Sequence, residues 1–490
     1  MTVVVVLRKF LILTHRYLGI AVCLLFVMWF VSGIAMIFAR GMPGLTPEVR
    51  FQHLPVMDTS AIKVSPAAAA EKAQLERSPN RALLLTVMDR PAYRFSVGGS
   101  TTTVFADSGD VLESVGEAEA IQIASHFMNV PGTKLHYAGE LLEPDQWTLE
   151  DRRVLPAHKI TVDDPAHTVL YVSEETAEVA LLTTRGSRAF AWFAAIPHWM
   201  YFAPLRQNGP VWRQVVLWTS GVATALATIG IILGFIQYST RYAGLMRWHY
   251  VTGVAFGVFC LTWVFSGLLS MEPFFWASGG GTGDRIAQAL RGGTLDLAHF
   301  PNLSLLDDGK EVEYLRIQGE YYYQVRTDLS ESLLVSADSP YIRRDLFSTE
   351  SLMDRVKQGN RDVPIVESSL LSNYDSYYHP TERKPPLPVL RVKFADPDAT
   401  WVYIDPHMSQ IVTRFTRRER LQRWIYHGLH SLDFNFWYYQ GPVWTSMMVL
   451  LNTGGACLST IGVILAIKRV TRRIRRVTRI PRVERSGVGV

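Results

Sequence analysis

Four long apolar stretches limit what this chain can fold into. Residues 10–39, 211–237, 251–271 and 443–467 are mostly apolar, and each has about 20 residues or more, enough for a helix to cross a hydrocarbon core of about 30 Å. The 48% hydrophobic content and the mean hydropathy of +0.10 are high for a soluble protein of 490 residues. The sequence therefore predicts a membrane α-helical protein with four transmembrane helices.

Basic residues near the ends of these stretches predict the orientation. They occur before the first helix, in the short turn between the second and third, and in residues 468–485, where nine Lys and Arg residues accompany one Glu. Because Lys and Arg are enriched on the cytoplasmic side, we expect an inner-membrane protein with both termini in the cytoplasm and two large periplasmic segments. The basic tail is expected to contact anionic membrane lipid, and no nucleic acid.

The sequence contains an internal repeat. His15, Gly19, Trp29, Ser32 and Gly33 recur 234 residues later as His249, Gly253, Trp263, Ser266 and Gly267. Residues around the second helix recur at an offset of 232: Trp192/Trp424, His198/His430, Gly209-Pro-Val-Trp against Gly441-Pro-Val-Trp, and Thr228-Ile-Gly against Thr460-Ile-Gly. The unit of helix, soluble segment, histidine and helix is therefore used twice in the same orientation.

The soluble segments show alternating apolar and polar residues, as in 93–97, 168–172, 321–325 and 401–404, with helical patterns at 118–128 and 348–357. Such patterns are typical of α+β domains. The predicted layout is transmembrane helix 1 (1–40), periplasmic domain A (41–190), outer His segment and helix 2 (191–238), cytoplasmic turn (239–248), helix 3 (249–276), periplasmic domain B (277–420), outer His segment and helix 4 (421–468), and basic cytoplasmic tail (469–490).

Histidines at the helix ends are the main candidates for chemistry. His15 and His249 begin equivalent helices on the inner side, and His198 and His430 precede equivalent helices on the outer side. Imidazole is a common axial ligand of haem iron, and ionisable residues at membrane depth tend to mark functional sites. We therefore expect two b-type haems, one for each pair, with Gly19 and Gly253 leaving room for a macrocycle. The alternative for any single histidine is an amphipathic anchor at the interface.

Further residues near the outer histidines are open to more than one interpretation. His427 lies three residues before His430. It is a second candidate for the outer ligand, or else a neighbour of the haem edge, a substrate contact or a solvated side chain. Its repeat counterpart is Ala195, which favours His430 as the ligand. Arg206, Arg213 and Arg423 are candidates for pairing with haem propionates, or for interfacial snorkelling. The nearby aromatic residues, including Trp199, Trp212, Trp444 and the run Phe436, Trp437, Tyr438 and Tyr439, are typical of an aromatic belt.

Several cofactor motifs are missing from the sequence. It has no Cys-x-x-Cys-His for covalent haem, and its three cysteines, Cys23, Cys260 and Cys457, all lie in apolar stretches. It has no Gly-x-Gly-x-x-Gly after a strand, no Walker loop and no cysteine cluster. An electron carrier of this kind would need an external donor, either a cytoplasmic reductase or quinol.

The sequence resembles the PepSY-associated transmembrane family, often called iron-regulated membrane proteins, which includes bacterial di-haem ferric-siderophore reductases. The resemblance covers nearly the whole chain. It rests on His15-Arg-x-x-Gly, on Trp-x-x-Ser-Gly at the end of the first and third helices, on the strand-turn segments 104–111 and 402–406, and on the segments Pro197-His198 and His427-Gly-Leu-His430.

The chain departs from the family pattern at two turns. Met408-Ser-Gln replaces Thr-Gly after the Asp-Pro turn, and the sequence near Glu175 reads Thr-Ala-Glu. The resemblance implies PepSY-like periplasmic domains and an oxidoreductase that passes electrons through two haems to a ferric siderophore or chelate in the periplasm, releasing Fe(II). The alternative is a non-redox membrane protein whose PepSY-like domains bind a peptide, a cell-wall fragment or a peptidase.

Overall fold

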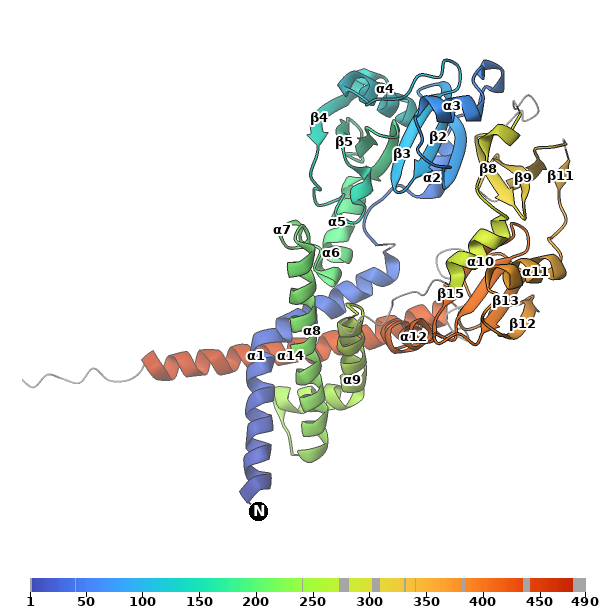
Figure 1. Ribbon diagram of the computed structural model, residues 1–490. Coiled ribbons are helices and arrows are strands. Elements are labelled where there is room, and N and C mark those ends of the chain that lie inside the picture. Colours follow the sequence, from blue (N-terminus) through green and yellow to red (C-terminus); the bar gives the residue numbers. More distant parts are fainter. Residues whose placement is uncertain are drawn as a thin grey trace, which may run out of the picture. The chain divides into compact units, whose positions relative to one another are not determined.

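The computed structural model describes the chain except residues 1, 40, 240, 273–281, 302–308, 330–331, 340, 381–383, 435–440 and 479–490. Two compact units form (Figure 1). The helical unit contains residues 1–41, 190–275 and 422–490, and the soluble unit contains residues 42–189 and 276–421. Of the features expected from the sequence, Phe436, Trp437, Tyr438, Tyr439 and the end of the basic tail lie outside the described residues.

Four long helices build the helical unit: α1 (Thr2–Phe38), α8 (Gly209–Ile236), α9 (Gly244–Leu269) and α14 (Pro442–Thr478). Among the described residues, these four helices are long and apolar enough to cross a membrane. The four predicted apolar helices are therefore present, and they suit a multi-pass membrane protein. Helix α14 continues through the basic residues up to Thr478. The expected boundary between the fourth span and the tail at residue 469 is therefore not a break in the helix.

Short helices lie in this unit or at its boundaries with the soluble unit in the chain. They are α5 (Arg185–Phe193), α6 (Ala195–Trp199), α7 (Ala203–Arg206), α12 (Arg417–Gln422) and the π-helix η5 (Arg423–Gly428). Helix α6 packs against α1, and η5 packs against α9. The segments that contain the predicted outer histidines are thus held against the first helix of their own repeat.

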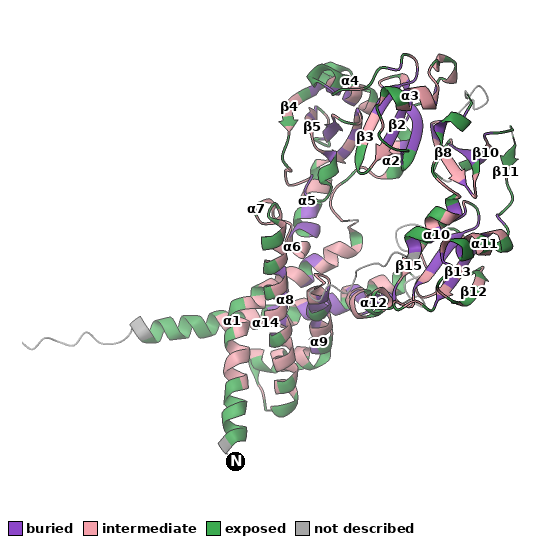
Figure 2. Ribbon diagram, in the orientation of Figure 1, coloured by how far each residue is buried: buried purple, intermediate pink, exposed green. Residues whose placement is uncertain are grey.

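The four long helices share an aromatic core. α1 packs along α14 and α8 packs along α9, with further contacts of α9 with α14 and of α1 with α8. Phe26, Phe30 and Trp263 are buried in this core, and a Cβ at Gly455 would lie 2.8 Å from the ring of Phe30. The large apolar side chains of Trp218 and Phe235 are exposed, and most of α1 and α8 is intermediate or exposed in burial (Figure 2). Such apolar exposure suits contact with lipid.

A seven-stranded antiparallel sheet joins the two soluble segments. The first contributes β1 (Arg81–Val87), β2 (Arg90–Val97) and β3 (Ser100–Phe105), and the second contributes β8 (Glu311–Ile317), β9 (Glu320–Arg326), β10 (Ser332–Ser336) and β11 (Ile342–Arg343). The strand order is β11-β10-β9-β8-β1-β2-β3, with Ala82 opposite Tyr314 across the central pair. The two inserted segments therefore share a sheet and belong to one compact unit.

Each soluble segment also forms its own four-stranded antiparallel sheet. The strands of the first are β4 (Leu135–Leu141), β5 (Ala157–Val162), β6 (Val169–Ser173) and β7 (Glu178–Thr183), and those of the second are β12 (Ile365–Leu371), β13 (Val389–Phe394), β14 (Trp401–Asp405) and β15 (Gln410–Phe415). The predicted strands fall in β2, β6, β9 and β14.

Helices accompany these sheets. The predicted helices correspond to α4 (Glu117–Met128) and α11 (Thr349–Gly359), and the unit also contains α2 (Pro47–His53), η1 (Thr59–Ala61), α3 (Pro66–Lys72), η2 (Gly132–Lys134), η3 (Arg152–Val154), α10 (Thr282–Arg291) and η4 (Leu297–His299). Helix α4 packs on the β4–β7 sheet, and α10 packs against α11. The α+β character expected for the inserted segments is confirmed.

The two turns that depart from the family pattern keep a conformation that favours glycine. Ala177 has φ of 51° and Ser409 has φ of 48°, and both residues are buried. The left-handed region costs a residue with a side chain roughly 1–2 kcal/mol. The fold therefore tolerates this strain in both repeats, and the surrounding core and hydrogen bonds, such as Gln318 Nε2 to Ser409 Oγ at 3.1 Å, hold the turns.

The two-residue turns of the shared sheet supply a test. Met88 and Asp89 connect β1 to β2 with φ of 49° and 61°, and Gln318 and Gly319 connect β8 to β9 with φ of 53° and 96°. Because glycine is preferred at the second position of such turns, Asp89→Gly should stabilise the chain by about 0.5–1 kcal/mol. The measurement is the apparent melting temperature of the purified chain in detergent.

The control is the reverse change at the equivalent position. Gly319→Asp should lower the melting temperature by a similar amount, since a Cβ there meets nothing closer than 3.8 Å and only the backbone conformation is affected. The exposed ion pair of Asp89 with His126 contributes little. A lower melting temperature for Asp89→Gly would contradict this account of the turn.

Candidate functional site

Four of the predicted histidines form two pairs in the helical unit. His15 of α1 and His249 of α9 have ring centroids 6.4 Å apart, with 46° between the ring planes. His198 of α6 and His430, in the helical turn that follows η5, have ring centroids 6.0 Å apart, with 66° between the planes. Each pair contains one histidine from each repeat, as the sequence predicts.

The spacing of both pairs suits two ligands of one metal centre. Two imidazoles that bind a metal from opposite sides, with metal–nitrogen distances of about 2.0 Å, have ring centroids about 6.3 Å apart. Among the described residues, no group of three or more His, Cys, Asp or Glu side chains is arranged to hold a metal ion. A bare zinc ion, which takes four ligands, would be under-coordinated by either pair. An iron porphyrin brings four in-plane nitrogens and needs only two axial ligands.

Serine hydroxyls orient the rings of the His198–His430 pair. Ser32 Oγ lies 3.2 Å from Nδ1 of His198, and Ser266 Oγ lies 3.0 Å from Nδ1 of His430. Each hydroxyl also donates to a carbonyl one turn earlier, that of Trp29 at 3.1 Å or Trp263 at 3.0 Å. Since a hydroxyl has one hydrogen, it accepts from Nδ1–H of the histidine. We therefore assign the proton to Nδ1 and a lone pair to Nε2, the form in which Nε2 binds a metal.

The backbone of the second helix of each repeat contacts the His15–His249 pair. Nδ1 of His15 lies 3.3 Å from the carbonyl oxygen of Leu226, which only accepts, so this nitrogen carries the proton and Nε2 has the lone pair. The equivalent backbone group, that of Leu458, faces His249, although Nδ1 of His249 makes no hydrogen bond among the described residues. The repeat thus supplies similar surroundings to both rings.

Glycines of α8 and α14 leave space for these rings. A Cβ at Gly230 would lie 2.9 Å from Cε1 of His15, and one at Gly462 would lie 3.9 Å from Cε1 of His249. The two glycines are equivalent in the repeat. At Gly19 and Gly253, which the sequence suggested as space for a macrocycle, a Cβ would make ordinary contact with Leu226 at 4.0 Å and Leu458 at 3.8 Å.

Burial keeps the His198 and His430 rings neutral. It lowers the pKa of His198 to about 4 and the pKa of His430 to about 3, because the charged form loses its hydration. The neighbouring histidine ring lowers the pKa of His430 further. Both imidazoles are therefore uncharged at neutral pH, which is the protonation state of a metal ligand.

Tryptophans tie the histidine-bearing loops to the long helices. Trp212 Nε1 donates to the carbonyl of Trp199 at 3.0 Å, and Trp444 Nε1 donates to the carbonyl of Ser431 at 2.7 Å. In each repeat, the acceptor is the residue directly after the histidine. These residues were expected as members of an aromatic belt, and the structure adds a specific role in placing His198 and His430.

The three predicted arginines have different surroundings. Arg206 lies over the rings of Tyr201 and Trp212, at 5.0 and 4.7 Å, and its buried Nε has no hydrogen-bond partner among the described residues. Arg213 donates to the carbonyls of Met271 and Glu272 at the end of α9.

Arg423 is 6% exposed and forms an ion pair with Asp433 at 3.3 Å. Asp433 therefore already occupies part of the guanidinium that was expected to meet a propionate. Sequence spacing alone did not reveal this pairing.

His427 belongs to the π-helix and is not a member of either pair. It is exposed, and its ring lies 4.7 Å from that of Tyr426, which in turn lies 5.4 Å from the ring of His430. π-helical turns occur frequently at functional sites. The structure thus pairs His430, rather than His427, with His198, and places His427 beyond Tyr426 on the exposed side.

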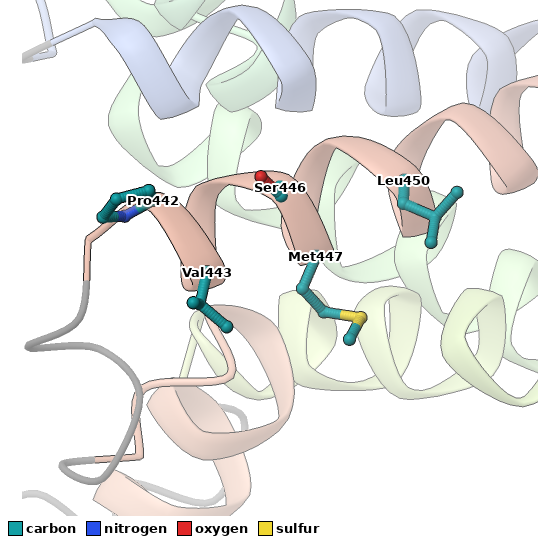
Figure 3. A pocket seen from close by; sticks show the side chains of 5 residues that line it. All are labelled: Pro442, Val443, Ser446, Met447 and Leu450. Carbon is teal, nitrogen blue, oxygen red and sulfur yellow. The ribbon is translucent and has the colours of Figure 1, made fainter.

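An apolar groove of about 430 Å³ runs along one face of α14 (Figure 3). It is lined by Pro442, Val443, Ser446, Met447 and Leu450. The lining contains no titratable side chain and none of the predicted site residues. The histidine pairs are therefore the stronger candidate for chemistry.

Comparison with known proteins adds no family assignment. No protein-family model matches the chain, and no curated protein matches it.

The sequence shows Ser32 and Ser266, and the glycines of the second helices, as repeated residues. That they contact the histidines is seen only in the folded structure.

The contact between Gly230 and His15 generates a prediction. Gly230→Ala should destabilise the chain by about 1–3 kcal/mol, since the added methyl group forces the His15 ring out of its place. Gly234→Ala is the matched control, because it lies one turn later on α8 and a Cβ there meets nothing within 4 Å. The difference between their apparent melting temperatures in detergent cancels the common gain in helix propensity, and equal values would contradict the packing.

Proposed function

We propose that the protein is a di-haem membrane protein that carries electrons across the bilayer. His15 and His249 would hold one b-type haem, and His198 and His430 would hold the other. The observation that carries the proposal is the centroid spacing of the two pairs, 6.4 and 6.0 Å. In His15, His198 and His430, Nδ1 also faces an acceptor, which leaves Nε2 with its lone pair. Arg206 is the candidate partner for a propionate.

The chemistry of the ligands supports haem over other groups. Bound haem supplies a one-electron change between ferric and ferrous iron inside the apolar unit. The four paired histidines would hold it through their neutral imidazoles, and the aromatic core would exclude water. No Cys-x-x-Cys-His occurs in the sequence, so a covalent c-type attachment by that motif is excluded and b-type haem remains.

The proposed placement of the pairs suits transfer across the bilayer. Ser32, which contacts His198, follows His15 on α1 by about 25 Å of helix, so the two pairs lie towards opposite ends of the bundle. We propose that both termini and the His15–His249 pair face the cytoplasm of a bacterium. Positive residues in the turn after α8 and at the end of α14 support this orientation.

The proposed acceptor is a ferric siderophore or chelate in the periplasm, and the donor is quinol or a cytoplasmic reductase. Each electron converts one chelated Fe(III) to Fe(II), which such chelators hold far less tightly. The resemblance to iron-regulated membrane proteins supports this choice, and the sequence has no nucleotide-binding or cluster motif of its own to supply electrons.

Haem content tests the cofactor. The purified full-length chain should show the reduced-minus-oxidised bands of low-spin haem b, and a pyridine haemochrome assay should give two haems per chain. His198→Ala and His430→Ala should each lose the same haem and leave one, because each removes one of two axial ligands. His15→Ala and His249→Ala should each lose the other.

His427→Ala is the matched control and should retain both haems, since its ring is in neither pair. A colourless preparation from haem-replete cells would overturn the proposal. It would favour instead a non-redox membrane protein whose soluble unit binds a peptide, a cell-wall fragment or a peptidase.

The substrate is tested separately from the cofactor. In proteoliposomes with a reduced quinol as donor, the chain should reduce a ferric hydroxamate siderophore, detected as Fe(II) by a ferrous-specific chelator. His430→Ala should reduce this rate to the background of liposomes without protein, because the path is interrupted. Haems that quinol reduces but the ferric hydroxamate does not reoxidise would rule out this acceptor while leaving the di-haem assignment in place.

A further inference from the structure

Two serine hydroxyls make equivalent hydrogen bonds beside the His198–His430 pair. Ser32 of α1 is 1% exposed and Ser266 of α9 is 0% exposed. Each accepts from Nδ1–H of its histidine and donates to the carbonyl of a tryptophan three residues earlier. A buried hydroxyl that only returned to its own helix would not need to face an imidazole, yet both do so at 3.2 and 3.0 Å.

We propose that Ser32 and Ser266 are positioning residues that set the tautomer of His198 and His430 and the reduction potential of the haem between them. The inference rests on the proposed function, because it assigns a role toward the second haem. Neither serine is expected to touch the haem or the substrate.

The hydrogen bond at Nδ1 affects how each histidine binds a metal through Nε2. An acceptor on Nδ1–H fixes which ring nitrogen keeps the lone pair and makes the ligand more basic. A more basic axial ligand favours ferric over ferrous iron and so lowers the reduction potential. Without the hydroxyl, the ring keeps only the backbone carbonyl of Trp29 or Trp263 as a neighbouring acceptor, so the Nδ1–H tautomer is less favoured over the Nε2–H tautomer, in which the proton would block binding.

The His15–His249 pair has no such serine among the described residues. His15 uses the backbone carbonyl of Leu226 as its acceptor, which no side-chain substitution removes. The serines therefore act on one site only. Substituting either serine should change one of the two haems and leave the other unchanged.

The experiment is a redox titration of purified Ser32→Ala and Ser266→Ala proteins, followed at the haem absorption bands. We expect one of the two midpoint potentials to shift upward in each variant, and the same one in both, with a further upward shift in the double variant. Ser32→Thr and Ser266→Thr keep a hydroxyl and should return the potential towards that of the unmodified chain.

Ser270→Ala is the matched control. Its hydroxyl also donates to a carbonyl three residues earlier, that of Gly267 at 2.7 Å, and it forms no hydrogen bond with a histidine in the part of the chain that the structure describes. It should leave both potentials unchanged. Both haems retained with unchanged potentials in Ser32→Ala and Ser266→Ala would overturn the positioning role, while a chain without haem would instead overturn the proposed function.

A second measurement needs no haem. In the haem-free chain with ¹⁵N-labelled histidine, His430 should carry its proton on Nδ1, and Ser266→Ala should shift population to the Nε2–H tautomer. The same tautomer distribution in both proteins would contradict the inference, whatever the haem content.

Discussion

The need to satisfy both nitrogens of buried imidazoles governs the helical unit. An unpartnered polar group in an apolar interior costs about 1–3 kcal/mol, and a ring nitrogen that finds an acceptor avoids this cost. Ser32, Ser266 and the Leu226 carbonyl face Nδ1 of His198, His430 and His15, which leaves Nε2 of these three rings with its lone pair. Nδ1 of His249 makes no hydrogen bond among the described residues. Helix spacing, glycine placement and loop anchoring all follow from keeping these rings in position.

Duplication makes such a site easy to build. Each repeat supplies its own histidine together with the group that orients it: Ser32 serves His198, and Ser266 serves His430. The pairs form only where the two repeats meet, as in the contact of His15 with His249. Each repeat therefore supplies one histidine of each pair, and the packing of the two repeats against each other forms both pairs.

The sequence predicts the spans and the repeat because both are local or periodic signals. Hydropathy locates α1, α8, α9 and α14, and the matched offsets pair the histidines before any coordinates are known. The β1–β8 pairing joins residues such as Ala82 and Tyr314, which no local pattern connects. The same limit applies to Ser32 and Gly230, since their repetition is visible but their contact with an imidazole depends on how helices from distant parts of the chain pack.

The repeat is broken at one place, and that break gives the two halves different surfaces. Arg423, Tyr426, His427 and Asp433 have Ala191, Ala194, Ala195 and Tyr201 as their counterparts at an offset of 232. The second copy thus adds a buried Arg423–Asp433 ion pair, a π-helix and a tyrosine ring beside His430. Buried ion pairs add little net stability, so stability alone does not account for this divergence.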